Sequence, residues 1–500
     1  MSSTPSRQAW VLAVALCAAT LLSCSSSGGG SEPCQGEGCA QSLMDRTPPT
    51  VLSLTPPDRS TGVWARDPIV VTFSEPLDPA SVTVDTFVLA DQFGSPVEHV
   101  AALSLDGKTL TVRTVGLPAV PNVLHAAVGR VRDRAGNTLA NWPVQWSWEL
   151  PDWQGLGNPV YEFYKYQSTA RIAVDGWGVP TVVGSSISGP SMGALRWSGS
   201  AWNTMPLPSA WLAVYEFGVD GDADGRLALA FTRRDAPPIV YASVWNGSAW
   251  SDSTVLSVDT TVWSNGPAVR LGPHGTAVAA WFESGALQVK RFDGTAWARL
   301  GDQPLETAGN STLVPDVSFD ADGSPRVTWT VGGVHSAAWS DATGAWHGTS
   351  TYPVPGSGPI LARANAAGEL YAVEVDQNLS PPQLVVYRYL PLAYAWVPVG
   401  GALDATSDRI PAEPDLAFDP AGQPVVAWVE GDGVFVARWD ADLERWEALG
   451  SDLDDRLDLV NRHNPDLAIG PGGHIEVVWE ASPRTATGYE HLFQVKRYNR

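Results

Sequence analysis

Aspartates at one recurring place are the residues best suited to bind a ligand in this chain of 500 residues. Asp316, Asp415 and Asp466 each follow a proline and begin a short apolar segment. If folding brings the three carboxylates together, they favour a cationic or hydroxyl-rich ligand. The alternative is structural, because a repeated Asp can accept backbone N–H groups at a bend of its own unit.

A second acidic motif has the form D-x-D-x-D-G, with Asp220, Asp222 and Asp224 before Gly225. Alternating carboxylates ahead of a glycine turn can wrap their oxygens around calcium. A calcium loop of the EF-hand type would also need a glutamate at the position of Phe231. We therefore expect a turn without metal, with calcium at these three aspartates as the alternative.

No combination of residues typical of a catalytic site is apparent in the sequence. The eight histidines are scattered, and none has a Cys, Ser or acidic partner at a spacing typical of catalysis. We expect a binding protein without a cofactor. The alternative is a hydrolase or lyase whose active site is assembled from loops.

The elements that position these residues follow from a repeat. Seven tryptophans recur at intervals of 47 to 50 residues, and a fixed period of this length indicates a repeat architecture. Because the period is strict, we interpret them as packing residues within or between repeats rather than as a platform for sugars. They are Trp153, Trp202, Trp250, Trp297, Trp346, Trp396 and Trp446.

Each repeat reads as four short strands. In the sixth, apolar segments at 414–418, 424–428, 434–439 and 446–450 are separated by Gly, Pro and Asp. Seven such units predict an all-β, seven-bladed β-propeller over residues 151–500. The last unit lacks a fourth strand, and residues 153–157 match it, so we expect the two ends of the propeller to pair and close the ring. Long loops should gather on one face, the one that carries the connections between blades, and bind the ligand there.

Residues 47–150 form a separate unit, with strand and turn signals about every ten residues that favour a β-sandwich. The stretch TFSEPLDPASV and the turn DRAGN resemble the SbsA-type bacterial Ig-like domain. The resemblance implies a spacer or adhesion module without catalytic residues.

The N-terminus predicts the location of the protein. Arg7 precedes an apolar run at 9–22 that is too short for a permanent membrane span. Leu21-Leu22-Ser23-Cys24 resembles a bacterial lipobox. That resemblance implies a signal peptide at 1–23, a lipidated Cys24 and, with Ser25 following, anchoring in the outer membrane. An ordinary cleaved signal peptide is the alternative, and residues 24–46 would form a flexible tether.

Cysteine content and charge complete the picture. Cys34 and Cys39 lie in the tether and could form a disulfide in an oxidising envelope. The formal net charge of −22 disfavours nucleic-acid binding.

Together these features predict a monomeric lipoprotein, anchored in the membrane and exposed in the envelope or at the surface. Its Ig-like domain would be a spacer, and its propeller would bind a glycan or a protein.

Overall fold

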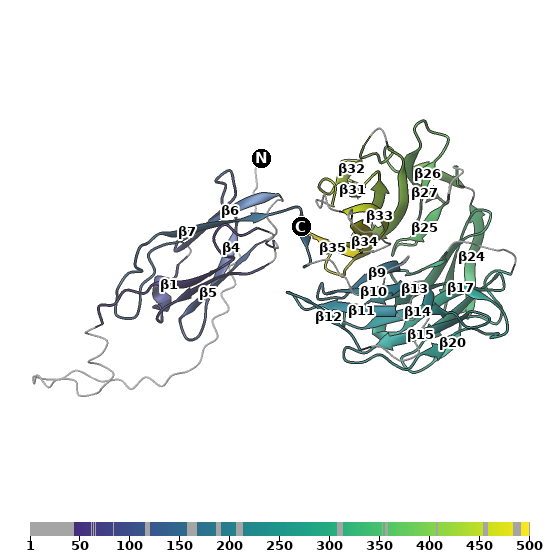
Figure 1. Ribbon diagram of the computed structural model, residues 1–500, viewed down its shortest axis with the longest axis horizontal. Helices are drawn as coiled ribbons and strands as arrows, with labels where there is room; N and C mark the ends of the chain where they lie inside the picture. The colour runs from purple at the N-terminus through teal and green to yellow at the C-terminus, as the bar shows by residue number, and fades with distance from the viewer. Residues whose placement is uncertain are drawn as a thin grey trace, which may run out of the picture.

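A computed structural model describes residues 45–499 apart from 62, 64, 66, 84, 116–120, 158–167, 187–191, 207–213, 308–313, 353, 356–358, 407–408, 454–458 and 484–491. Within these residues the fold is all-β, as predicted, with only two short 3-10 turns, η1 (Pro79–Ser81) and η2 (Pro273–Gly275). No helix in this part of the chain is long and apolar enough to cross a bilayer. Figure 1 shows two units, a sandwich in purple and a ring that runs from teal to yellow.

The first unit is a β-sandwich. One sheet has the order β1-β2-β5-β4 and the other β3-β6-β7. Alternate residues of each strand point inward, and Phe73, Leu110 and Trp148 are buried between the sheets. The strands are β1 (Val51–Thr55), β2 (Ile69–Phe73), β3 (Phe87–Ala90), β4 (His99–Leu103), β5 (Thr109–Thr114), β6 (Asn122–Val128) and β7 (Val144–Leu150).

The second unit consists of seven four-stranded antiparallel sheets, which we call blades 1 to 7. Blade 1 contains β9 (Ser168–Val174), β10 (Pro180–Ser186), β11 (Met192–Trp197) and β12 (Trp202–Thr204). Blade 2 contains β13 (Val214–Gly221), β14 (Leu227–Arg233), β15 (Ile239–Trp245) and β16 (Thr254–Val255). Blade 3 contains β17 (Ser264–Leu271), β18 (Ala277–Glu283), β19 (Ala286–Phe292) and β20 (Trp297–Arg299).

The remaining blades repeat this order. Blade 4 contains β21 (Asp316–Phe319), β22 (Pro325–Thr330), β23 (Val334–Ser340) and β24 (Ala345–Tyr352). Blade 5 contains β25 (Leu361–Ala364), β26 (Leu370–Asp376), β27 (Gln383–Leu390) and β28 (Ala395–Pro398). Blade 6 contains β29 (Pro411–Phe418), β30 (Pro424–Glu430), β31 (Gly433–Asp440) and β32 (Arg445–Ala448). Blade 7 contains β33 (Leu459–Ile469), β34 (Ile475–Pro483), β35 (Leu492–Tyr498) and β8 (Trp153–Gly155).

The ring closes as the sequence predicts. β8, from the start of the propeller, pairs with β35 at its end, with Trp153 opposite Tyr498 and Gly155 opposite Lys496. Blade 7 then contacts blade 1 through β33 and β9. The seven-bladed propeller closed by its two ends is therefore confirmed.

The repeated tryptophans lie between blades. Each packs on the aromatic residue opposite it in the third strand, and the seven pairs of ring centroids are 5.1–5.7 Å apart. Trp446 also donates its indole N–H to the carbonyl of Val399 in the preceding blade, at 2.7 Å. Equivalent bonds to the preceding blade are made by Trp153, Trp202 and Trp346. The interpretation of these residues as packing residues is confirmed.

The turn between the first and second strands is closed by the same backbone hydrogen bond in every blade. In blade 6 the N–H of Asp419 donates to the carbonyl of Gln423, and the Asp419 carboxylate accepts the N–H groups of Ala421 and Gln423. Gly422 has φ of +79°, a conformation that favours glycine. These turns and the hairpins between third and fourth strands share one face of the ring, the tight-turn face. The connections between blades lie on the other, the long-loop face.

Candidate binding site in the propeller channel

A cavity of about 660 Å³ occupies the centre of the ring, where the first strand of every blade lines it. In each blade one charged residue of this wall lies two or four residues before the turn that ends the first strand, and we call these seven residues the channel ring. They are, in order of blade, Arg171, Asp220, Arg270, Asp316, Arg363, Asp415 and Asp466.

Arginines of the channel ring bridge neighbouring aspartates. Arg363 lies between Asp316, at 3.4 Å, and Asp415, at 2.8 Å. Arg270 pairs with Asp220 at 3.1 Å and lies 3.9 Å from Asp316. The side chains are 10–36% exposed, so they are shielded from bulk water without being sealed from it.

The ring of charges continues from blade 7 to blade 1. Arg171 of blade 1 lies 3.5 Å from Asp466 of blade 7. Asp466 is also the neighbour of Asp415, so two aspartates follow one another at this point of the ring.

Aspartates of the channel ring also bind the backbone of the next blade. Asp415 accepts the N–H of Leu467 at 2.8 Å, and Asp466 accepts the N–H of Ile172 at 2.7 Å. Asp220 likewise accepts the N–H of Leu271 at 2.8 Å. Each of these carboxylates therefore ties two blades together, which differs from the structural alternative considered above, in which each Asp served its own blade.

The charges of the channel ring are not balanced. Three arginines and four aspartates leave a formal charge of −1 when all are ionised. Burial raises the pKa of Asp466 to about 6, and the nearby Asp415 adds to the effect while Arg171 opposes it. Burial also raises the pKa of Asp220 and of Asp316, although arginines oppose it at both.

The predicted ligand aspartates are thus brought into one cavity. Asp316 and Asp415 share Arg363, and Asp415 adjoins Asp466. Their binding of a ligand stays a prediction. Asp220 belongs to the same ring, although the sequence pattern associated it with calcium.

Arg270 and Arg363 were missed because they do not occupy the Pro-Asp position, and Arg171 was missed because it occupies the equivalent position with the opposite charge. Asp316 and Asp415 lie four residues before the first turn residue of their blade, whereas Arg270 and Arg363 lie two residues before it. Residues two apart on a strand face the same side, so both positions point into the channel. The number of residues between each arginine and the repeated turn of its blade was the signal that could have identified these arginines.

The other members of the D-x-D-x-D-G motif lie in the turn. Asp222 accepts the N–H groups of Asp224 and Arg226, as Asp419 does for its turn in blade 6, and its second oxygen pairs with Arg226 at 2.6 Å. Asp224 also pairs with Arg226, at 3.0 Å. Asp220 points instead to Arg270, so the motif is divided between the turn and the channel; calcium binding there stays a prediction.

The mouth of the channel on the long-loop face is built from bulged strands. Glu413 and Asn464 both have positive φ, 50° and 49°, next to register shifts in β29 and β33. Glu413 accepts the N–H of Asn464 at 2.6 Å, and its other oxygen lies 3.4 Å from the ring of His463. A bulge re-aims side chains at the rim of a sheet, and here it turns polar groups toward the mouth.

Buried glutamates hold two of the long connections in place. Glu430, 1% exposed, accepts the N–H groups of Ala405 and Thr406 and the indole N–H of Trp428. Glu283 accepts the N–H groups of two residues in the connection between blades 2 and 3. These parts of the long-loop face are therefore preorganised by internal hydrogen bonds.

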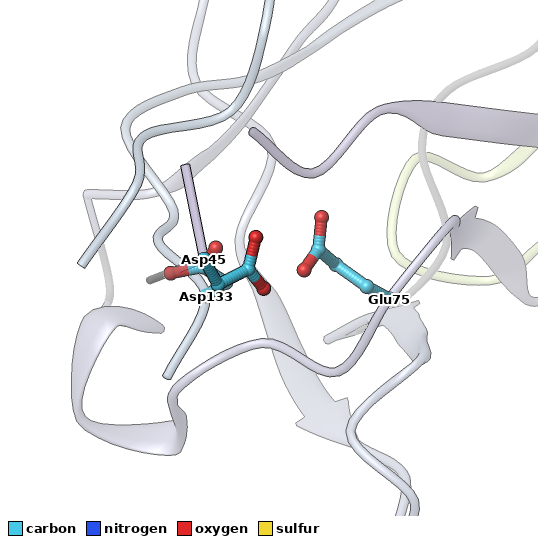
Figure 2. A group of neighbouring side chains, drawn as sticks. All are labelled: Asp45, Glu75 and Asp133. Carbon is cyan, nitrogen blue, oxygen red and sulfur yellow. The ribbon is translucent and has the colours of Figure 1, made fainter. Parts of the chain in front are cut away.

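The first unit has an acidic group of its own, at Asp45, Glu75 and Asp133 (Figure 2). Among the described residues it alone brings three metal-ligand atoms within 4.8 Å of one another. Burial, then the charges of Asp133 and Asp45, raise the pKa of Glu75. Asp133 already accepts the N–H and side-chain amide of Asn137, which closes the DRAGN turn.

The predicted lipidation at Cys24 and the predicted disulfide between Cys34 and Cys39 lie outside the described residues. They stay predictions.

Comparison with known proteins identifies the first unit. Residues 45–149 match the model of a bacterial Ig-like domain, so the chain combines such a domain with a seven-bladed β-propeller. No curated protein matches the chain closely enough to count as a relative.

Solved structures resemble the chain only distantly. A protein of unknown function from Dyadobacter fermentans is 12% identical, covering 70% of this chain and 100% of that one, with a TM-score of 0.41. The oligogalacturonate lyase of Vibrio parahaemolyticus is 9% identical, with 76% and 98% covered and a TM-score of 0.44. The Aleuria aurantia lectin is 14% identical, with 64% and 96% covered and a TM-score of 0.36. At this level the likenesses carry no argument about ligand or reaction.

Proposed function

We propose that this protein is a membrane-anchored lipoprotein of the bacterial outer membrane, displayed in the envelope or at the surface. Its Ig-like domain is a spacer, and its propeller binds a glycan or a protein through the long-loop face. The observation that carries the proposal is the central cavity, in which charged side chains from all seven blades converge. A rigid scaffold with convergent polar groups in a concave site is the usual form of a recognition site.

Two further observations support the long-loop face. Two of its connections are held by buried glutamates, so a ligand meets an ordered surface there and less entropy is lost on binding. Trp263, in the connection before β17, is 71% exposed. An exposed indole offers a flat apolar surface of the kind on which sugar rings and protein side chains pack.

The chain offers a matched pair of tryptophans that tests the face. Trp263 lies on the long-loop face, whereas Trp177, 68% exposed, lies in a turn of the tight-turn face. The purified protein should be screened on a glycan array and against envelope proteins. For any ligand found, we expect Trp263→Ala to weaken binding about tenfold or more and Trp177→Ala to leave it unchanged.

The reverse result, with binding lost only in Trp177→Ala, would place the site on the tight-turn face. Turnover of polysaccharides or esters, screened in parallel, would favour the hydrolase or lyase alternative.

Fractionation of cells expressing the parent and a Cys24→Ala variant tests the anchor, since only the parent should sediment with outer membranes. If both proteins sediment alike, the lipoprotein part of the proposal is wrong.

A further inference from the structure

Asn499, the residue after β35, is fully buried although it stands next to the end of the chain. Its side-chain oxygen accepts the N–H of Ala65 at 2.6 Å. Its amide donates to the carbonyls of Val63, at 2.8 Å, and Pro151, at 2.9 Å. Both amide hydrogens and the oxygen of this side chain are therefore used.

These contacts join three parts of the molecule. Val63 and Ala65 belong to the loop between β1 and β2 of the Ig-like domain, and Pro151 belongs to the two-residue linker between β7 and β8. The backbone N–H of Asn499 also donates to the carbonyl of Asp152, at 2.8 Å. One propeller residue thus fixes both the linker and the neighbouring domain. Removing its side chain would leave buried polar groups without partners, which is costly.

The junction lies at a defined place on the ring. In other blades a tight hairpin joins the third and fourth strands, as at Ser198 to Ala201 of blade 1. In blade 7 those strands are the two ends of the propeller, so residues 151–152 and 499 occupy the place of that hairpin. In Figure 1 the C-terminus lies between the two units, next to β35. The Ig-like domain therefore joins the tight-turn face.

We propose that Asn499 locks the Ig-like domain to the tight-turn face of blade 7, so that the two domains move as one body. The short linker adds to this rigidity, because proline at 151 restricts its backbone. As a consequence the long-loop face and the mouth of the channel are held on the side away from the Ig-like domain. The lock does not depend on which ligand the propeller binds.

The test uses the full chain and small-angle X-ray scattering. We expect the parent to scatter as a single rigid particle, and Asn499→Ala to give a broader and longer distribution of intramolecular distances. Calorimetry should show the two domains unfolding in separate transitions in this variant. Asn246→Ala is the control, because Asn246 organises the corresponding hairpin of blade 2 without touching the Ig-like domain.

A second variant separates loss of the lock from opening of the ring. Ala65→Pro removes the bonded N–H from the side of the Ig-like domain and leaves β8 and β35 unchanged. It should broaden the scattering profile while the propeller melts at the temperature of the parent. If Ala65→Pro and a folded Asn499→Ala both scatter like the parent, the proposal is overturned. If Asn499→Ala fails to fold, the scattering of Ala65→Pro alone decides.

Discussion

Each aspartate of the channel ring that binds a backbone N–H of the next blade is held by two different interactions. Asp415 pairs with Arg363 through one oxygen and accepts the N–H of Leu467 through the other. A charge held so firmly is costly to move, since removing one partner leaves the other buried and uncompensated. A ligand in the channel would therefore meet a preformed field of charges.

The acidity of Asp466 gives a prediction about pH. Its pKa is raised from 3.8 to about 6, so the folded protein holds a proton that the unfolded chain has released. The stability gained from this proton is complete below pH 3.8 and is lost as the pH rises through about 6. The contribution is at most about 3 kcal/mol. We expect the parent to melt at a higher temperature at pH 5 than at pH 7.5, and Asp466→Asn to show a smaller rise.

Asp293→Asn is the control for this measurement. Hydrogen bonds from Ala296 and Thr295 lower the pKa of Asp293 to about 2, so its contribution is lost only in strong acid. This variant should keep the pH dependence of the parent between pH 7.5 and 5. Glu476 and Glu480, with pKa values raised by burial to about 7 and about 8, add to the rise in all three proteins. Equal slopes for the parent and Asp466→Asn would contradict the prediction.

At the scale of elements, contacts between blades are made by the fourth-strand tryptophans, and two of these provide a matched comparison. Trp446 donates its N–H to the carbonyl of Val399, whereas the N–H of Trp396, in the equivalent place of blade 5, has no partner among the described residues. Phenylalanine at either position removes a similar volume. We expect Trp446→Phe to lower the free energy of unfolding by about 1 kcal/mol more than Trp396→Phe. Urea unfolding followed by circular dichroism measures the difference, and equal losses would mean that the indole bond contributes nothing.

These elements were predictable from the sequence because each blade repeats the same local rules. The period of the tryptophans, the turn glycines and the alternation of the strands are all local, and they predicted seven blades and their closure. The strand predicted at 414–418 is longer in the structure, starting at Pro411, because a bulge at Glu413 lets the strand continue past the Pro-Asp pair.

The channel ring was only partly predictable, because it depends on which residues of different blades meet. Asp316, Asp415 and Asp466 share a strand position and were found together. Arg171 has the same position but the opposite charge, so no Pro-Asp pattern marked it. The place of Asp220 in the channel ring was not predicted, since the adjacent turn aspartates concealed its offset from the turn. The bonds of Asn499 to Val63 and Ala65 were out of reach, since they join residues more than 400 positions apart.

At the scale of the whole molecule, one short strand holds the ring closed. β8 has three residues, yet it completes blade 7 and covers the edge of β35. Replacing Gln154 with proline would remove its backbone N–H, a hydrogen-bond donor, from this strand. We expect Gln154→Pro to cost about 1–3 kcal/mol and to increase light scattering on heating, because the edge of blade 7 becomes free to pair with another molecule.

Asn203→Pro provides the comparison. Asn203 faces Arg196 in blade 1 as Gln154 faces Arg497 in blade 7, but its strand does not join the two ends of the ring. This variant should lose stability with less aggregation, since the remaining strands of blade 1 stay joined in sequence. Equal aggregation of the two variants would mean that closure by β8 has no special role.

The order of charges around the channel has a consequence that follows from counting alone. A closed circuit can alternate between two kinds of member only if its length is even, and this propeller has seven blades. From Arg171 to Asp415 the charges alternate in sign. Because the number of positions is odd, one pair of neighbours must have the same sign, and here Asp466 repeats the negative charge of Asp415. No choice of arginine and aspartate at seven such positions could avoid a like-charged neighbour somewhere. The position of that mismatch is free to vary, and in this molecule it falls beside the seam where the two ends of the propeller meet.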